Sequence, residues 1–474
     1  MSRSTRGWGG IPFEGIGLGR EALMRKDCSF STLFVAALFG LLALSPSSAH
    51  AVPSYARQTG LACNGCHTTP PELNGAGRRF KLLGYTDRAQ DTPTVNNEPG
   101  TRHAGLDLLK TLPFSAMLET SFTSTKSAQP GTQNSTFELP QDVSLFLAGG
   151  WSAHVGSFIQ VTYDAQSDHF SIDNTDIRYA NTTKLAGKEL IYGLTLNNNP
   201  TVEDLWHTTP AWGYPFIASD SAPTPGAGPV ILGALAQDVA GIGAYAMWND
   251  HLYLAGAVYR SNHIGNSQPN SGEGFATNIR GVAPYWRVAW QQSIGSDNYV
   301  EVGAYGLHMT STPGAVTGLQ DSFTDWAVDL QYDRTLFVRD VLSFRGSYVR
   351  ENSSLAATFD QGGAAQSAHN LSVFMANVEY HFGNRCSVAL GWQDTSGTAD
   401  ALLYAPGPLT GAANGSPNST AYTGNLSWWP VQNIQLALQY TAYTRFNGAS
   451  TNYDGAGRNA SDNNTTYLLA RFIF

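Results

Sequence analysis

From residue 112 onward, apolar and polar residues alternate with a period of two, which is typical of β-strands that have one apolar face. In the stretch 251–259, one face carries Leu252, Leu254, Gly256 and Val258. In the stretch 433–440, Gln435 and Gln439 lie on the face opposite a row of large apolar residues. The alternation therefore predicts strands that each present an apolar face to one environment and a more polar face to another.

The alternation, together with aromatic residues at segment ends and turn residues between segments, predicts sixteen strands. They are expected near residues 113–126, 137–149, 155–164, 174–183, 188–197, 240–249, 251–261, 280–291, 298–309, 323–334, 339–351, 370–382, 385–395, 420–429, 434–446 and 465–474. Sixteen strands are more than a soluble β-sandwich usually has. A soluble sandwich or a repeat of β-hairpins is the alternative.

The connections between these predicted strands alternate in length. Tight turns are expected at 249–250, 383–384 and 430–433, whereas connections after odd-numbered strands run from about ten to about forty residues. Outer-membrane barrels have short periplasmic turns and long extracellular loops. The sequence predicts an all-β transmembrane barrel over residues 111–474, with long loops outside and a terminal strand that ends in Phe474.

Composition supports a barrel in the lipid of an outer membrane. Charged residues make up 13% of the chain, against about 25% in a soluble protein. Aromatic residues make up 11%, and no apolar run after residue 51 approaches the about 18 residues of a membrane helix. With the five basic and three acidic residues of 1–51 set aside, 22 basic and 33 acidic residues remain, a net charge of −11. This balance argues against nucleic-acid binding and suits acidic loops that attract cations.

The start of the chain has the pattern of an export signal. An apolar run at 33–44 follows Arg25 and Lys26, and small residues up to Ala51 end it. We expect residues 1–51 to be removed, with Met24 as an alternative true start. The run is too short to span a bilayer comfortably, so a membrane anchor is the weaker interpretation.

The stretch Cys63-Asn64-Gly65-Cys66-His67 is a c-type haem attachment signature. Two thiols three positions apart can each form a thioether with one haem, and the following histidine can reach the iron as an axial ligand. A thioredoxin-like pair would need a βαβ context, and a structural zinc site would need four ligands. Beyond Cys63 and Cys66, the exported chain has Cys386 alone, expected to be a packed thiol. Residues 52–110 are therefore predicted to be a segment that binds one covalent haem c.

The residues around this motif resemble the amino terminus of the fused outer-membrane cytochrome–porins, a family of iron oxidases from iron-oxidising bacteria. The similarity covers 51–67 and extends to the stretches 71–73, 77–81, 112–117, 194–201 and 209–212. Pro70 and Ala76 depart from it, because aromatic residues are expected near the haem at these positions.

The resemblance implies a one-haem electron conduit through the outer membrane. Extracellular Fe(II) would donate an electron, and a periplasmic c-type cytochrome would accept it. Because the hydrocarbon layer is about 30 Å thick, a haem segment that plugs the barrel lumen would shorten both transfers. The same conduit with another reduced donor, or a diffusive porin with a structural haem, are the other hypotheses.

Two further sets of residues are candidates. The sixth haem ligand is expected to be Met117 or His103. The alternatives are a lipid-facing or packing role for Met117 and a solvated loop position for His103. In the longest predicted loop, Glu203 and Asp204 form a carboxylate pair that could guide Fe(II), or simply be solvated.

Overall fold

The computed structural model describes residues 53–89, 94–95, 106–107, 112–233, 235–262, 278–314, 317–337, 339–407 and 411–474. The predicted signal at 1–51, the candidate ligand His103 and the predicted boundary near residue 110 lie outside these ranges.

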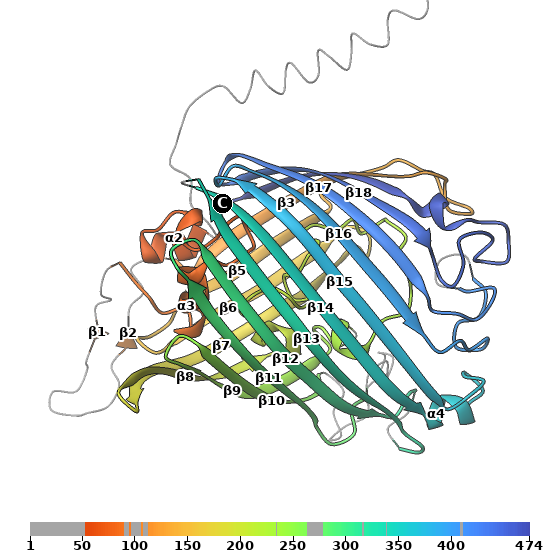
Figure 1. Ribbon diagram of the computed structural model, residues 1–474, viewed down its shortest axis with the longest axis horizontal. Coiled ribbons are helices and arrows are strands. Elements are labelled where there is room, and N and C mark those ends of the chain that lie inside the picture. Colours follow the sequence, from red (N-terminus) through yellow and green to blue (C-terminus); the bar gives the residue numbers. More distant parts are fainter. Residues whose placement is uncertain are drawn as a thin grey trace, which may run out of the picture. The chain divides into compact units, whose positions relative to one another are not determined.

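Seventeen strands of the described residues close into one antiparallel barrel (Figure 1). Strands next to each other in sequence pair with one another, except that β4 and β5 both pair with β3. In chain order they are β3 (Phe114–Thr125), β4 (Thr136–Glu138), β5 (Asp142–Gly150), β6 (Val155–Asp164), β7 (His169–Leu185), β8 (Lys188–Asn197), β9 (Val239–Trp248), β10 (Leu252–Ser261), β11 (Ala283–Ile294), β12 (Asn298–Ser311), β13 (Asp321–Leu336), β14 (Asp340–Leu355), β15 (Ala368–Phe382), β16 (Cys386–Gly397), β17 (Ser419–Val431), β18 (Ile434–Arg445) and β19 (Thr465–Ile473). Outside the barrel, β1 (Thr94–Val95) pairs with β2 (Leu106–Asp107).

The sixteen predicted strands are confirmed, with one addition. The second predicted strand is divided into β4 and β5 around Pro140, which has no N–H to donate to a sheet. The barrel closes where β19 pairs with β3, and the terminal Phe474 exchanges two backbone hydrogen bonds with Ala116, at 2.7 and 2.9 Å. The aromatic chain end is thus part of the seam.

The two faces of each strand differ as the alternation predicts. On β10, Leu254 and Val258 are exposed on the outer face, whereas Tyr253, Ala257 and Tyr259 are buried on the inner face. Lipid is the environment that accepts such an apolar outer surface on a closed barrel. The molecule is therefore an outer-membrane-type barrel. No helix among the described residues is long and apolar enough to cross a membrane.

Connection lengths alternate along the barrel with one exception. The connections at 151–154, 186–187, 249–251, 295–297, 337–339, 383–385 and 432–433 form a rim of short turns. Most connections on the other rim are longer, and the longest, 198–238, follows β8. The prediction of about ten residues before β7 is wrong: β7 begins at His169, which leaves 165–168 as a tight turn.

The segment before the barrel is short and helical. It contains α2 (Pro53–Thr59), the 3-10 turn η1 (Cys63–Gly65) and α3 (Gly75–Leu82). Asn74 begins α3 by accepting hydrogen bonds from the N–H groups of Ala76 and Gly77 at 2.9 and 3.1 Å. Ser54 of α2 lies 3.1 Å from Ser115 on the inner face of β3 (Oγ to Oγ), which places α2 against the barrel wall.

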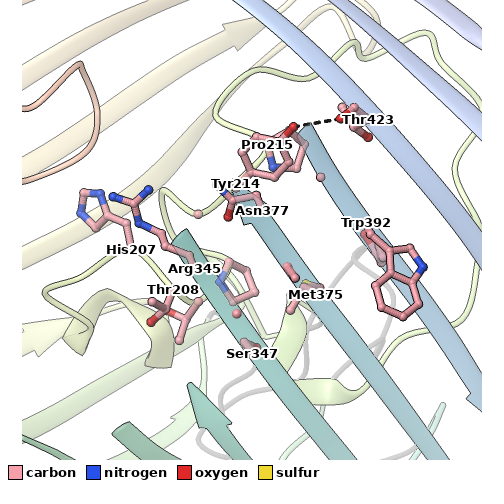
Figure 2. A pocket seen from close by; sticks show the side chains of 17 residues that line it. His207, Thr208, Tyr214, Pro215, Arg345, Ser347, Met375, Asn377, Trp392 and Thr423 are labelled. Carbon is pink, nitrogen blue, oxygen red and sulfur yellow. Dashed lines mark hydrogen bonds between the residues drawn. The ribbon is translucent and has the colours of Figure 1, made fainter. Parts of the chain in front are cut away.

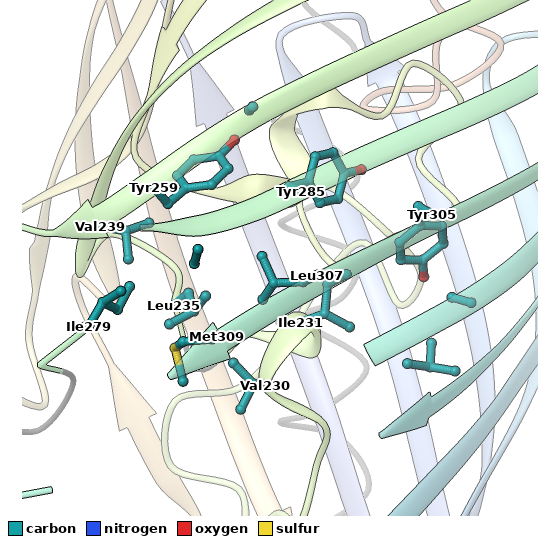
Figure 3. Close-up of a cluster of buried hydrophobic side chains, with 14 residues drawn as sticks. Val230, Ile231, Leu235, Val239, Tyr259, Ile279, Tyr285, Tyr305, Leu307 and Met309 are labelled. Atoms are coloured by element: carbon teal, nitrogen blue, oxygen red, sulfur yellow. The ribbon is translucent and has the colours of Figure 1, made fainter. Parts of the chain in front are cut away.

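The longest connection turns inward and fills part of the lumen. It contains the 3-10 turns η2 (Pro200–Glu203) and η3 (Val230–Leu232), and Figure 3 shows Val230, Ile231 and Leu235 facing aromatic and aliphatic residues of the wall. The N–H groups of Val230 and Ile231 each donate to a wall carboxylate, Glu351 and Asp325, at 2.7 Å. Of the other short helices, α4 (Ala356–Asp360) follows β14, and the 3-10 turn η4 (Ala460–Asn463) precedes β19.

Candidate functional site

A single tight turn carries both thiols and the imidazole of the haem motif. The N–H groups of Cys66 and His67 donate to the carbonyl of Cys63 at 3.1 and 2.9 Å, which fixes the three side chains relative to one another. Cys63 is buried, Cys66 is half-buried, and both are free thiols. Burial raises the pKa of Cys63 to about 12 and raises that of Cys66 too, so both sulfurs remain protonated at neutral pH.

The imidazole of His67 is oriented by the backbone. Its Nδ1 lies 3.1 Å from the carbonyl oxygen of Pro71, an acceptor, so Nδ1 carries the proton and Nε2 has the free lone pair. Metal-binding histidines usually have this arrangement, in which the second ring nitrogen donates to a carbonyl or carboxylate. Burial lowers the pKa of His67, which favours the neutral ring that a metal ligand requires.

A small recess adjoins the motif, and its empty space of about 230 Å³ includes open solvent. Five of its lining residues belong to the haem segment and three to the short-turn rim: Cys63, Asn64, His67, Thr68, Pro70, Asn384, Trp429 and Gln432. Gln432, in the turn before β18, accepts a hydrogen bond from the N–H of Cys63 at 2.8 Å. Two free thiols, an imidazole with an available Nε2 and a wall containing Trp429 fit a c-type haem.

Several polar contacts fix the haem segment inside the barrel. The ammonium of Lys81 donates to the carbonyl of Asp204 at 2.7 Å, and the hydroxyl of Tyr85 donates to Asp176 of β7 at 2.6 Å. Arg79 forms a bidentate pair with Glu189 of β8, with both distances 2.9 Å. The segment therefore contacts the wall and the inward loop together, near the short turns.

The burial of Lys81 makes the free energy of unfolding depend on pH. Burial, with a further contribution from the nearby charge of Arg178, lowers the pKa of Lys81 to about 7. Between pH 7 and the usual lysine pKa, Lys81 binds one proton fewer in the folded protein than in the unfolded chain. The contribution of Lys81 to the free energy of unfolding therefore increases as pH rises. We expect Lys81→Met to remove this increase, measured by urea unfolding at several pH values between about 7 and 10. Lys126→Met, at an exposed lysine, should leave it unchanged.

The interpretation of Glu203 and Asp204 as a solvated loop pair is wrong, and their guidance of Fe(II) stays a prediction. Both side chains are buried, at 1% and 0% exposure, because the loop that carries them lies inside the barrel. Glu203 Oε2 lies 3.7 Å from Arg178, and Asp204 Oδ1 lies 3.2 Å from Arg287. Burial raises the pKa of Glu203 to about 7, whereas Arg287 and the N–H of Trp206 outweigh burial and lower the pKa of Asp204 to about 2. The pair holds the inward loop to the wall.

The sixth haem ligand stays a prediction. Met117 lies on the inner face of β3, between the buried residues Ser115 and Glu119. The other candidate, His103, is outside the described residues.

The inward loop adds a buried histidine to this region. His207 has a φ of 57°, and its ring centre lies 5.7 Å from that of Trp212. Burial, followed by the charge of Lys81, lowers the pKa of His207 well below its ordinary value. Within the described part of the chain, its Nδ1 has no hydrogen-bond partner. His207 is thus a neutral imidazole deep in the lumen.

A second and larger cavity lies between the inward loop and strands β14 to β17. Figure 2 shows His207, Tyr214 and Pro215 on the loop side and Arg345, Met375 and Asn377 on the wall side. Its empty volume is about 550 Å³. Arg345, at its edge, pairs with Glu72 of the haem segment.

Sequence reasoning missed Glu72, Arg345, Glu379 and His381, which form one buried group. Glu379 and His381 stand at alternate positions near the end of a correctly predicted strand, on the face opposite Val378 and Tyr380. Two ionisable residues on the strand face turned away from lipid indicate a candidate functional site in the lumen. Their meeting with Glu72, more than three hundred residues earlier, is a property of the closed barrel.

No protein-family model matches the chain, and no curated protein matches its sequence. Among solved structures, the chain is similar to the outer-membrane channel DcaP of Acinetobacter baumannii (12% identity, 76% of this chain and 96% of that one, TM-score 0.44). It is also similar to OmpT of Vibrio cholerae in a form lacking loop L8 (10% identity, 76% and 98%, TM-score 0.43) and to OmpF of Salmonella typhi (12% identity, 77% and 98%, TM-score 0.42).

Proposed function

We propose that the protein is an outer-membrane cytochrome c–porin fusion that oxidises extracellular Fe(II) and passes the electron to a periplasmic c-type cytochrome. The observation that carries the proposal is the turn of Cys63, Cys66 and His67, whose imidazole donates through Nδ1 to the Pro71 carbonyl beside a barrel-lined recess. In this proposal the long loops face the outside and the rim of short turns faces the periplasm.

Each residue of the turn has a distinct role in this proposal. Haem c supplies a centre that accepts and releases one electron. Cys63 and Cys66 would hold it covalently, and His67 would ligate the iron through Nε2. The carbonyl of Pro71 keeps the His67 ring in one orientation and one tautomer. Trp429 and Gln432 of the rim cover the thiol side and limit the access of water.

The position of the haem segment supports a transmembrane route. Lys81 reaches the inward loop and Tyr85 reaches β7, so the segment extends into the lumen from the short-turn rim. An electron donor that enters from the long-loop rim then has less than the full hydrocarbon thickness of about 30 Å to cover. The acidic balance of the chain favours the approach of cations, and salt should weaken this attraction.

We expect one covalent haem per chain, because the sequence has a single Cys-x-x-Cys-His motif. The pyridine haemochrome spectrum of purified protein measures the stoichiometry and the two thioether bonds. Cys63→Ala or Cys66→Ala should change that spectrum and reduce the covalent haem content. Cys386→Ala is the matched control, because Cys386 is a free thiol at the start of β16. Full haem content in the double variant of Cys63 and Cys66 would contradict the attachment.

Stopped-flow reduction of the ferric protein by Fe(II) tests the donor. Rapid reduction by Fe(II), at a rate that falls as salt is raised, is the expected result. If Fe(II) fails and another reduced metal or a sulfur compound reduces the haem rapidly, the conduit has a different donor.

A further inference from the structure

One buried group beside the haem segment has the composition of a metal site. It consists of Glu72, between η1 and α3, and of Glu379 and His381 on the inner face of β15. One ligand atom from each of the three lies within 4.8 Å of the other two. All three residues are at least nine-tenths buried, with exposures of 0%, 3% and 0%. Two carboxylates and an imidazole at this spacing suit a divalent first-row transition metal.

The hydrogen bonds around His381 point its free lone pair at a carboxylate. Its Nδ1 lies 3.1 Å from the hydroxyl of Thr69, and that hydroxyl donates to Glu72 Oε2 at 3.3 Å. Because the Thr69 hydroxyl donates its proton to Glu72, it accepts the hydrogen bond from His381. Nδ1 of His381 therefore carries the ring proton, and Nε2 has the lone pair. His381 Nε2 lies 3.2 Å from Glu72 Oε2 without forming a hydrogen bond. Two acceptors at this distance repel each other unless a cation lies with them.

The third residue of the group, Glu379, also has a side-chain oxygen that is available to a metal ion. Among the described residues, Glu379 Oε2 has no hydrogen-bond partner, although it is buried. Glu379 Oε1 lies 3.8 Å from His381 Nδ1. The guanidinium of Arg345 pairs with Glu72 Oε1 and balances one of the two carboxylates. The second negative charge needs a proton or a metal ion, because a buried carboxylate is not stable as an isolated charge.

The place of this group suits an electron donor to the haem. Glu72 follows Pro71 directly, and the carbonyl between them is the one that His67 Nδ1 contacts at 3.1 Å. A path of one side chain, one peptide unit and one hydrogen bond thus joins the group to the axial ligand. On the opposite side, Arg345 and Asn377 line the larger cavity of about 550 Å³, and Asn377 and Glu379 share the inner face of β15. The cavity thus extends to Arg345, which pairs with Glu72, and to Asn377, which lies two residues before Glu379.

We propose that Glu72, Glu379 and His381 bind Fe(II) as the electron-donating substrate. This proposal rests on the proposed function. The bound Fe(II) would lose one electron and leave as Fe(III), and the electron would pass to the haem that Cys63, Cys66 and His67 would hold, with no covalent bond of the protein made or broken. Thr69 acts as a positioning residue, because it orients the His381 ring.

Binding of Mn(II) to the full haem-loaded protein tests the site without any redox reaction. Electron paramagnetic resonance follows the loss of the free Mn(II) signal. We expect one site per chain, and about tenfold or more weaker binding in Glu379→Gln and in His381→Gln. Asp360→Asn is the matched control, since Asp360 is an exposed carboxylate of α4 that belongs to neither carboxylate cluster of the described residues that could hold a metal ion. Each variant is accepted only if it retains the wild-type haem spectrum and the heat-dependent electrophoretic mobility of a folded barrel.

The outcomes separate the site from the function. Absence of Mn(II) binding, or equal binding in Glu379→Gln and wild type, overturns the site even if Fe(II) still reduces the haem. Mn(II) binding that depends on Glu379 and His381, without any reduction by Fe(II), supports a metal site and contradicts the proposed function. If both proposals hold, the two variants reduce more slowly at limiting Fe(II) and as fast as wild type with dithionite.

Discussion

Replacement of Arg287 with alanine is expected to release the inward loop and to raise the ionic conductance of the barrel severalfold. The guanidinium lies 2.6 Å from Asp329, 3.2 Å from Asp204 and 3.4 Å from Glu301, and all four side chains are fully buried or nearly so. Without it, three carboxylates face one another in the lumen with no cation among them. Removal of one partner from a buried ion pair costs about 3–5 kcal/mol.

This cost falls mainly on the loop, because Glu301 and Asp329 belong to barrel strands that are each paired with a neighbouring strand on both sides. Asp204 belongs to the loop at 198–238 and can leave by moving away from the wall. Arg287 also lies over the ring of Trp206 at 5.2 Å, and this contact is lost in the same substitution.

Single-channel recording in planar bilayers measures the effect. Wild-type protein should pass little current, because the haem segment and the inward loop occupy the lumen. Arg350→Ala is the matched control: Arg350 lies on β14 and bonds to Ser372 of the neighbouring strand, so conductance should stay at the wild-type level. A large wild-type conductance would favour the hypothesis of a diffusive porin with a structural haem. Equal conductance in Arg287→Ala and wild type would show that Arg287 does not hold the loop.

The barrel is predictable from sequence because the alternation that marks each strand lies within that strand's own residues. Each strand needs an apolar face toward lipid, and the period of two marks that face without any knowledge of partners, as in Leu254 and Val258 of β10. The split of the second strand and the early start of β7 were missed, since element boundaries depend on pairing with neighbours that the pattern does not reveal.

The lumen is much less predictable, because its contacts join residues far apart in the chain. Glu203 and Asp204 lie in a long loop, and loops usually run over the surface. Their partners Arg178 and Arg287 lie on β7 and β11, and nothing in the local sequence shows that the loop turns inward. The haem motif is different: Cys63, Cys66 and His67 are placed by one turn, so their proximity follows from five consecutive residues, and covalent haem attachment there stays a prediction.

The most direct test of the account is the reduction of the haem in intact cells by Fe(II) held on a chelating polymer too bulky to pass through porins. The absorbance of ferrous haem is followed before and after the outer membrane is permeabilised, in a strain that makes this protein as its only outer-membrane cytochrome. A strain carrying the Cys63→Ala, Cys66→Ala double variant corrects for other cytochromes. We expect the wild-type haem to be reduced in intact cells, at a rate that permeabilisation does not raise. Reduction that occurs only after permeabilisation would place the electron-accepting site on the periplasmic side and contradict the transmembrane conduit.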